Sequence, residues 1–347
     1  LTGFVAGCQA ASPASSGTER FPLLGQARDI LQEWYVEPQK LDDTKLQGGA
    51  IKGMLQALDD PYTSYLSPED YKMELASLEG KFEGIGAYVT KKGPDLVVIA
   101  PIPGTPAEKA GIRPGDLILA VEGEPVADLS LNEAVLRIRG PRGTQVKLLI
   151  LHEGERQPVT LTITRAEIPT VSLHQRREGE MGYIQIFHFT QRTTEEFQQA
   201  LSDLAGSGVQ GLVLDLRNNP GGLLTTVVDV ADELLDEGLV LFEVDNQGQR
   251  KEWRSQDGGT ATRLPIVVLV NRFSASGSEV LSGALQDRGR AIVMGEQTFG
   301  KGSVNTIHVL EDRSAIYLTS ARWLTPQGRP IEGKGLAPDI AIEPPPE

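Results

Sequence analysis

The sequence predicts a multi-domain α+β protein in three successive parts: an N-terminal helical segment over residues 21–78, a small β-rich, barrel-like domain over residues 79–165, and an α/β core over residues 166–347. Apolar residues recur at helical spacing in the first part, which is typical of short amphipathic helices. Short strand-like runs separated by glycine turns fill the second part. In the third part strand-like runs alternate with amphipathic helical runs, which predicts a layered sheet. A chain of this length is long enough for about two to three domains.

The composition is that of a globular protein with a formal net charge of −14. Binding to phosphate needs a basic surface, so this charge argues against a nucleic-acid partner. Cys8 is the only cysteine, so no intramolecular disulfide can form. We expect no cofactor and no metal, because the histidines lack the spacing of metal ligands. They are His152, His174, His188 and His308.

Residues 1–20 resemble the end of a bacterial lipoprotein signal followed by a flexible tether. Apolar residues and then small ones precede Cys8, which implies cleavage before Cys8 and acylation of its thiol. The alternative is the end of an ordinary signal peptide or signal anchor, with an inert thiol. Small residues over 12–17 are typical of a tether. Both alternatives predict an exported protein, periplasmic or extracytoplasmic, with the lipid or the signal anchor holding it at a membrane.

Three short helices are predicted in residues 21–78. The first carries its apolar residues at helical spacing up to Trp34 and stops before Pro38. The second spans residues 45–58, and the third begins at Pro68, a residue suited to the first helical position. So few residues bury little core alone. We therefore expect the segment to pack on another domain or on a second subunit, as in a homodimer.

The second part has two short helices among its strands. Thr105-Pro106 starts the first helix, with threonine as the cap and proline at the first helical position. Ser130 and Glu133 form a capping box that opens the second helix, which continues through Ile138. The predicted strands lie at residues 96–100, 117–121, 146–151 and 159–164.

In the third part, three loops follow successive strand-like runs. Their residues are 217–222, 274–279 and 298–303, after predicted strands that end near residues 216, 270 and 295. Sites in open α/β sheets gather at the C-terminal ends of the strands. The sequence therefore predicts that these three loops converge.

Two of these loops supply the partners of a Ser/Lys dyad. A serine hydroxyl is a poor nucleophile at neutral pH unless a base lies beside it. A lysine can be that base when burial depresses its pKa. Ser274–Glu279 offers the serine and Thr298–Ser303 offers Lys301. The chain is therefore a candidate serine hydrolase that needs no histidine.

Simpler interpretations exist for each of these residues. Ser276 and Glu279 fit a capping box, so Ser276 could be only a helix cap. Lys301 could be a solvated surface lysine. Pro220-Gly221-Gly222 could be a plain turn.

Residues 103–118 resemble the signature of a PDZ domain. PDZ domains bind a peptide C-terminus as an added strand, and backbone N–H groups of a glycine loop hold its carboxylate. The resemblance gives that role to Gly84, Ile85, Gly86 and Ala87. The alternative is that these glycines only turn the chain.

The chain as a whole, from residue 21 to 340, resembles the carboxyl-terminal processing proteases, which are tail-specific serine proteases with a PDZ domain. Motifs in family order carry the resemblance, and the family implies a crotonase/ClpP-like protease core. Besides the PDZ signature, the motifs lie at residues 50–54, 58–62, 215–222, 274–279, 298–302 and 333–339.

The resemblance also implies roles for individual residues. Ser276 matches the nucleophile and Lys301 the base, with the family's separation between them. The family usually has a glutamine four residues after the lysine to orient it, and this chain has Asn305, which is shorter by one methylene. Gly277 replaces the usual alanine in the serine cluster.

The mechanism that this implies is acyl transfer to Ser276 with Lys301 as general base and acid. The oxyanion would be held by the N–H of Gly277 and one N–H of Gly221 or Gly222. The family acts on exported or membrane-associated polypeptides with exposed, apolar C-termini, so we expect cleavage near such a tail.

Three other functions compete with this one. A trypsin-like protease is rejected, because Pro220 stands where its serine would belong and the PDZ signature precedes the core. A crotonase-like acyl-transfer enzyme leaves the PDZ domain unexplained. A catalytically impaired PDZ peptide-binding module is the remaining alternative, and Asn305 motivates it.

Overall fold

The computed structural model describes residues 21–72, 83–168 and 172–342. The predicted lipobox at Cys8, its tether and the expected boundary near residue 79 lie outside the described residues. Part of the third predicted helix, beyond residue 72, also lies outside them.

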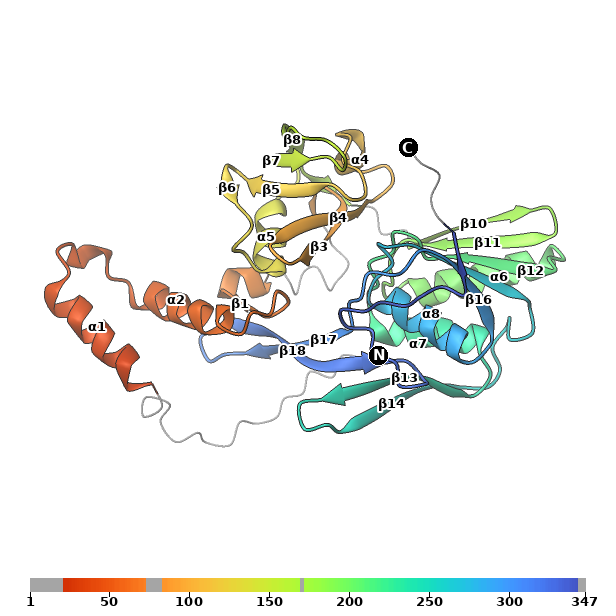
Figure 1. The fold of residues 1–347 in the computed structure, drawn as a ribbon. Helices are drawn as coiled ribbons and strands as arrows, with labels where there is room; N and C mark the ends of the chain where they lie inside the picture. The colour runs from red at the N-terminus through yellow and green to blue at the C-terminus, as the bar shows by residue number, and fades with distance from the viewer. Residues whose placement is uncertain (1–20, 73–82, 169–171, 343–347) are drawn as a thin grey trace.

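The N-terminal segment contains the helices α1 (Pro22–Trp34) and α2 (Asp43–Gln56), the 3-10 turn η2 (Pro38–Lys40) and the short strand β1 (Ser64–Leu66). A third helix begins at Pro68, as predicted, and is described as far as residue 72. Asp42 caps α2 by accepting hydrogen bonds from the N–H groups of Thr44 and Lys45. Helices α1 and α2 project from the rest of the molecule (Figure 1). No residue of α1 is buried, so this helix contributes nothing to the core of the chain that carries it.

The second domain has a six-stranded antiparallel sheet, a separate two-stranded ladder of β2 and β9, and two helices. Its elements are β2 (Glu83–Gly84), β3 (Ala87–Lys92), β4 (Asp95–Pro101), α4 (Pro106–Lys109), β5 (Leu117–Val121), β6 (Glu124–Pro125), α5 (Leu131–Ile138), β7 (Gln145–Leu151), β8 (Val159–Thr164) and β9 (Ala166–Glu167). Alternate residues of β7 enter its core, as the two-residue period of a strand requires. The predicted capping box of Ser130 and Glu133 is confirmed at the start of α5. In the strand order β3-β4-β5-β7-β8, strand β3 lies at the edge.

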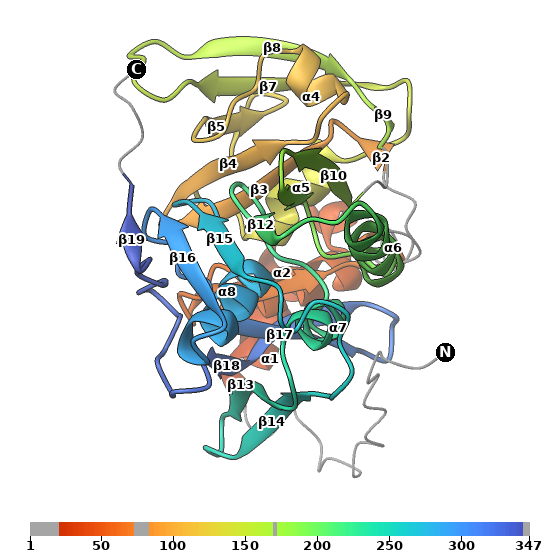
Figure 2. The same ribbon diagram turned by 90° about the vertical axis from the view of Figure 1, so that its right-hand side faces the viewer.

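The core has two sheets and three helices: β10 (Leu173–Glu178), β11 (Met181–Ile186), α6 (Thr193–Gly206), β12 (Gly211–Asp215), α7 (Leu224–Leu234), β13 (Gly238–Asp245), β14 (Arg250–Ser255), β15 (Ile266–Val270), α8 (Gly277–Asp287), β16 (Ala291–Gly295), β17 (Ser303–Val309), β18 (Ala315–Leu324) and β19 (Ile340–Ala341). One sheet has the order β10-β11-β12-β15-β16-β19, and its strands from β11 onward are parallel. The other has the order β1-β18-β13-β14, with β17 paired to β18. Helix α8 contacts both β16 and β13 and thus lies between the sheets (Figure 2).

The predicted α+β class is confirmed, with an N-terminal helical segment, a small β-rich domain and an α/β core. Strands β12, β15 and β16 are parallel neighbours, so their C-terminal ends meet at one edge of the sheet. The three loops named from the sequence leave from that edge, which places them together. This arrangement follows from the rule that sites of open α/β sheets form outside the carboxyl ends of their strands.

The second domain packs directly on the core. Val97 and Ile99 of β4 form a buried apolar cluster with Phe273, a residue of the loop after β15. The rings of Tyr88 and His188 lie in contact beside it, with their centroids 4.9 Å apart and their planes tilted by 36°. Burial lowers the pKa of His188 to about 4, so this histidine is neutral at pH 7. The same loop that touches the second domain therefore leads to Ser276.

Candidate active site

Ser276 lies at the N-cap of α8, in a conformation that non-glycine residues rarely adopt. Its φ is 55° and its ψ is −115°, and the residue is 8 % exposed. Backbone strain of this kind persists only where the surroundings impose it. Here the Ala275 N–H donates to the Asn219 carbonyl at 2.9 Å, and the Ser274 hydroxyl donates to the Leu216 carbonyl at 2.8 Å. The turn after β12 thus fixes the serine loop.

Glu279, buried in the first turn of α8, joins the serine loop to the lysine loop. Its Oε2 accepts from the N–H groups of Ser276 and Lys301, at 2.8 and 2.9 Å. Its Oε1 accepts from the Thr298 hydroxyl at 2.6 Å and the Gly300 N–H at 2.7 Å. Burial raises the pKa of Glu279 to about 7, although these four donors favour the carboxylate. The sequence indicated a capping box here but not this second role.

Lys301 lies in the loop between β16 and β17 and is partly buried. Burial lowers the pKa of its ammonium, while the carboxylates of Glu332, Glu279 and Asp60 act in the opposite direction. The Nζ lies 4.7 Å from the centroid of the Tyr62 ring. A lysine in this position is desolvated, as a general base requires, and is not a solvated surface lysine.

Within the described residues, no hydrogen bond joins the Ser276 hydroxyl to the Lys301 Nζ. Their backbones are nevertheless held by one carboxylate oxygen, within two hydrogen-bond lengths of each other. Catalytic hydrogen bonds are often long without substrate and tighten in the complex. The backbone geometry is therefore compatible with a dyad whose two side chains are not hydrogen-bonded to each other in this structure.

Two unused N–H groups lie next to Ser276. The Gly221 N–H donates to Oδ1 of Asn219 at 2.8 Å and is therefore occupied. Among the described residues, the N–H groups of Gly222 and Gly277 have no protein acceptor. A Cβ built on Gly277 would lie 3.5 Å from the Gly222 nitrogen, so the two groups are close. Of the two glycines left open by the sequence, Gly222 is the one whose N–H remains available for an oxyanion.

The glycine turn is anchored by two polar side chains of the 215–222 motif, to which the sequence analysis assigned no role. Asn219 is fully buried and donates from Nδ2 to the Ile186 carbonyl at 2.8 Å. Asp215 is also fully buried and pairs with Arg217 at 2.6 Å. The Tyr183 hydroxyl donates to the same Asp215 oxygen at 2.6 Å. These contacts fix the end of β12 and hence the turn.

Asn305 lies on β17, at the point where its register with β18 shifts. Its Nδ2 donates to the Tyr62 carbonyl at 3.2 Å and to the Thr319 hydroxyl at 3.0 Å. Its Oδ1 accepts from the Ser303 hydroxyl at 3.5 Å. The Asn305 amide is thus linked to Lys301 only indirectly, because it binds the Tyr62 carbonyl and the Tyr62 ring contacts the Lys301 Nζ. None of these three hydrogen bonds involves the Lys301 amine.

The predicted carboxylate-binding loop lies at the start of the edge strand β3. Gly86 has a φ of 81°, and a Cβ there would lie 2.4 Å from Thr105, so only glycine fits. The carbonyls of Ile85 and Gly86 accept from the N–H groups of Ala107 and Ile102, at 2.8 Å each. In the described part of the chain, the N–H groups of Ile85 and Gly86 have no acceptor. The loop therefore presents free donors beside a free strand edge, which is what a peptide carboxylate needs.

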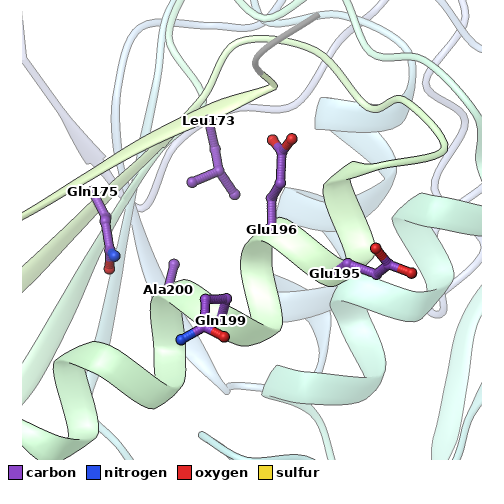
Figure 3. Close-up of a pocket in the computed structure, with 6 residues that line it drawn as sticks. All are labelled: Leu173, Gln175, Glu195, Glu196, Gln199 and Ala200. Carbon is purple, nitrogen blue, oxygen red and sulfur yellow. The ribbon is translucent and has the colours of Figure 1, made fainter. Parts of the chain in front are cut away.

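An open pocket between β10 and α6 is separate from this site (Figure 3). Glu196 at its wall accepts hydrogen bonds from the Ser172 N–H and hydroxyl, at 3.0 and 2.7 Å. None of the residues of the candidate active site lines it. The pocket is lined by Leu173, Gln175, Glu195, Glu196, Gln199 and Ala200.

Among the described residues, no group of three or more histidine, cysteine, aspartate or glutamate residues is arranged to hold a metal ion. Over those residues, no helix is both long enough and apolar enough to cross a bilayer.

Three family models match the chain in the expected order. The model of the activating protease CtpB N-terminal domain matches residues 6–70, that of the PDZ domain matches residues 97–152, and that of peptidase family S41 matches residues 180–342.

Relatives match over nearly the whole chain. The carboxy-terminal processing protease CtpA of Bacillus subtilis (strain 168) is 39% identical over 331 residues, which cover 95% of this chain and 70% of the relative. The carboxy-terminal-processing protease of Bartonella bacilliformis is 41% identical over 309 residues, which cover 88% and 71%. The structure of the photosystem II D1 C-terminal processing protease is similar with a TM-score of 0.82 and 34% sequence identity, covering 96% of this chain and 94% of that chain. These matches confirm the resemblance that the motifs carried: the chain belongs to the carboxy-terminal processing proteases of peptidase family S41, which are serine-type peptidases, and it has their PDZ domain.

Proposed function

We propose that the chain is a serine endopeptidase that cleaves polypeptides near their C-terminus, with Ser276 as nucleophile and Lys301 as base. The single observation that carries this proposal is the shared carboxylate of Glu279. It holds the Ser276 and Lys301 N–H groups at one oxygen, while burial lowers the pKa of the lysine. A desolvated lysine beside a serine in a strained turn is the arrangement that serine activation without histidine requires.

In the proposed reaction, the neutral Lys301 amine takes the proton of the Ser276 hydroxyl as its oxygen attacks the scissile carbonyl. The C–N bond then breaks, Lys301 returns the proton to the leaving amine, and an ester with Ser276 remains. Water attacks this ester with Lys301 again as base, which releases the new carboxylate and restores Ser276. The N–H groups of Gly222 and Gly277 would stabilise the oxyanion in both steps.

The PDZ domain would bind the tail of the substrate. The free strand edge of β3 and the free N–H groups of Ile85 and Gly86 support this role. Gly84 and Ala87 complete the loop, and Gly84 pairs with Ala166 in the short β2–β9 ladder. The substrates would be exported or membrane-associated proteins with exposed, apolar C-termini.

The test uses a labelled peptide with a free apolar C-terminus and mass spectrometry of the products. Wild type should cut it, and Ser276→Ala should bind it without cutting. Lys301→Met, which keeps the unbranched stem, should also lose turnover. Cleavage by Ser276→Ala at the wild-type rate would exclude the nucleophile, and cleavage by Lys301→Met would exclude the base.

A second candidate is a catalytically impaired PDZ module that binds tails without cutting them. The hydrogen bonds of Asn305 favour it, because the amide that should orient Lys301 donates to Tyr62 and Thr319. The same peptide distinguishes the two functions. If the chain is such a module, the wild-type protein binds the peptide and releases no cleavage product.

We also propose that the protein is exported and held at a membrane, periplasmic or extracytoplasmic, through an acylated Cys8. The residues before Cys8 support a lipobox. Labelling of cells with a fatty-acid analogue should mark the wild type and not Cys8→Ser, and the protein should fractionate with membranes. An unlabelled protein in the soluble fraction would overturn the lipid anchor.

A homodimer through residues 21–78 is proposed on the exposed apolar side chains of α1. Ile30 is 60 % exposed and Trp34 is 74 % exposed, on a helix with no buried residue. A second copy of this helix would cover them. Light scattering should give twice the chain mass for wild type and less for the double variant Ile30→Glu and Trp34→Glu. A monomeric wild type would overturn the dimer.

A further inference from the structure

The Lys301 ammonium faces an aromatic ring that comes from the other end of the chain. Its Nζ lies 4.7 Å from the centroid of the Tyr62 ring, and Tyr62 as a residue is 9 % exposed. A cation within about 6 Å of a ring face is attracted by the ring quadrupole, and more strongly where water is excluded. The contact therefore favours the ammonium over the neutral amine.

The position of this ring is set by the fold and not by the lysine. The Tyr62 N–H donates to Oδ1 of Asp60 at 3.0 Å, and its carbonyl accepts from Asn305 at 3.2 Å. The next residue, Thr63, accepts at its hydroxyl from the Thr319 N–H at 3.1 Å. Strand β1 then pairs with β18. The segment is thus tied to the same hairpin that follows the lysine loop.

Charged groups of three other elements also face the ammonium. They are Glu279 of α8, Glu332 of the turn after β18, and Asp60 of the N-terminal segment. Arg322 of β18 pairs with Glu332 at 3.5 Å. Within the described residues, the Lys301 Nζ donates no hydrogen bond and forms no ion pair. The Tyr62 ring therefore contacts the amine directly, whereas the three carboxylates act on it only at longer range.

We propose that Tyr62 is a positioning residue for the Lys301 base: its ring face seats the ammonium and makes release of the lysine proton harder. The inference rests on the proposed function, in which the neutral amine takes the Ser276 proton. Tyr62 acts through Lys301 and has no role in bond making. The N-terminal segment thereby completes an active site whose nucleophile and base lie in the core.

The test measures the titration of Lys301 directly, by the ¹³Cε chemical shift in lysine-labelled protein. Lys301→Met assigns the signal, and the Ser276→Ala background prevents self-digestion. The variants are Tyr62→Leu, which removes the ring, and Tyr62→Phe, which keeps it. Burial raises the pKa of Tyr62 itself to about 12, so the phenol stays neutral over the titration. The pH dependence of kcat/KM is measured beside it in the Ser276 form.

Tyr65 provides a matched control. It is an aromatic residue of the same segment, 7 % exposed, and its ring packs against Gly48. Tyr65→Leu therefore makes the same loss of a buried ring without touching the lysine.

In Tyr62→Leu, the pKa of Lys301 should fall by roughly 0.4–1.5 pH units, from the range measured for cation–π contacts. The rising limb of kcat/KM should move to lower pH by the same amount, and the plateau should drop because the amine is less well placed. Tyr62→Phe and Tyr65→Leu should keep the wild-type titration. An unchanged titration in Tyr62→Leu, or an equal shift in Tyr65→Leu, overturns the inference.

Fluorinated phenylalanine at position 62 keeps the inference testable if Tyr62→Leu does not fold. Fluorine weakens the ring quadrupole at nearly constant shape, so the pKa of Lys301 should fall stepwise with fluorine number, and a constant value overturns the inference. Failure of the proposed function looks different. Cleavage by Lys301→Met removes the dyad, whereas the ¹³C titration still reports whether Tyr62 holds the ammonium.

Discussion

Ser276 and Lys301 share one acceptor: both backbone N–H groups donate to Oε2 of Glu279, at 2.8 and 2.9 Å. The proposed nucleophile and the proposed base come from different loops, so their distance depends on how these loops are joined. A buried carboxylate that binds both N–H groups sets that distance without touching either reacting atom. The proposed dyad is thus organised by a residue whose own chemistry takes no part in the proposed reaction.

Glu279→Gln should lower kcat/KM by on the order of 10²-fold, the scale of a misplaced catalytic group. The glutamine NH₂ would face N–H or O–H donors, and each buried donor left without a partner costs about 1–3 kcal/mol. Peptide cleavage and denaturant unfolding measure the two effects. Glu196→Gln is the control, because Glu196 also accepts from a backbone N–H and a hydroxyl but lies outside the site. Wild-type turnover in Glu279→Gln would contradict the clamp.

Gly221→Ala should abolish cleavage, whereas Gly277→Ala should not. Gly221 has a φ of 98°, and its new Cβ would lie 2.6 Å from the Gly277 nitrogen and 2.8 Å from Ser276. The new Cβ would displace the backbone at Ser276, the proposed nucleophile, and with it the Gly277 N–H, a proposed oxyanion donor. Loss of an oxyanion donor costs about 10²–10³ in rate. At Gly277 the new Cβ meets a methyl group of Val227 at 2.7 Å, which can give by a small shift. Comparison of kcat for the two variants checks the difference, and equal losses would refute it.

Glu332→Gln should move the rising limb of the pH–rate curve to lower pH. The proposed dyad needs the neutral amine, so activity should rise as pH passes through the pKa of Lys301. Glu332 is the largest influence that raises this pKa against burial, and its removal lowers the pKa further. Glutamine at 332 still accepts from the Gly302 N–H, now bound at 2.8 Å. Glu311→Gln, at an exposed position, is the control. A shift to higher pH would mean that the neutral lysine is not the limiting form.

Gly86→Ala should weaken binding of an apolar C-terminal peptide to the PDZ domain. The new Cβ would lie 2.4–2.7 Å from Thr105 atoms, so the loop must move and its free N–H groups with it. Gly93→Ala is the matched control, because Gly93 also has a positive φ, of 61°, but has nothing within 4 Å of the new Cβ. Fluorescence anisotropy with a labelled peptide compares them. We expect a loss of at least about tenfold at Gly86 relative to Gly93, or about 1.4 kcal/mol.

The sequence predicted those parts of the structure that depend on neighbouring residues. Capping signals located the starts of α5 and α8, and alternating strands and helices gave the core sheet. Strand β14 was missed because its charged residues give no apolar alternation; Arg250, Lys251 and Glu252 are all exposed. The match to a known family, not the pattern itself, singled out Ser276 among three serines.

The contacts that complete the site depend on residues far apart in the chain, and no local pattern predicts them. Glu279 fits the capping box on which the simpler interpretation of Ser276, as only a helix cap, depends. The same carboxylate also binds the lysine loop. The motif at residues 58–62 supports the family resemblance but by itself assigns no role to any of its residues. The structure brings its Tyr62 to Lys301 through the pairing of β1 with β18, which only the tertiary fold determines.

Lys301→Met should stabilise the protein at neutral pH while it abolishes cleavage. In the native state burial lowers the pKa of Lys301 below its usual value of 10.5. Between the native pKa and 10.5, the unfolded chain binds more protons than the native one, so wild-type stability rises with pH in that window. Below the native pKa, the wild type bears the full cost of a buried ammonium that methionine does not have.

The advantage of Lys301→Met should therefore be largest at low pH and shrink toward pH 10.5, at no more than about 1.4 kcal/mol per pH unit for one proton. Urea unfolding of both proteins from pH 6 to 10 measures the difference, in which other titrating groups cancel. Lys334→Met, at an exposed position, should show no such trend. If Lys301→Met were less stable at every pH, the attraction of Glu332, Glu279 and Asp60 would outweigh desolvation, and Lys301 would be too basic to accept the Ser276 proton.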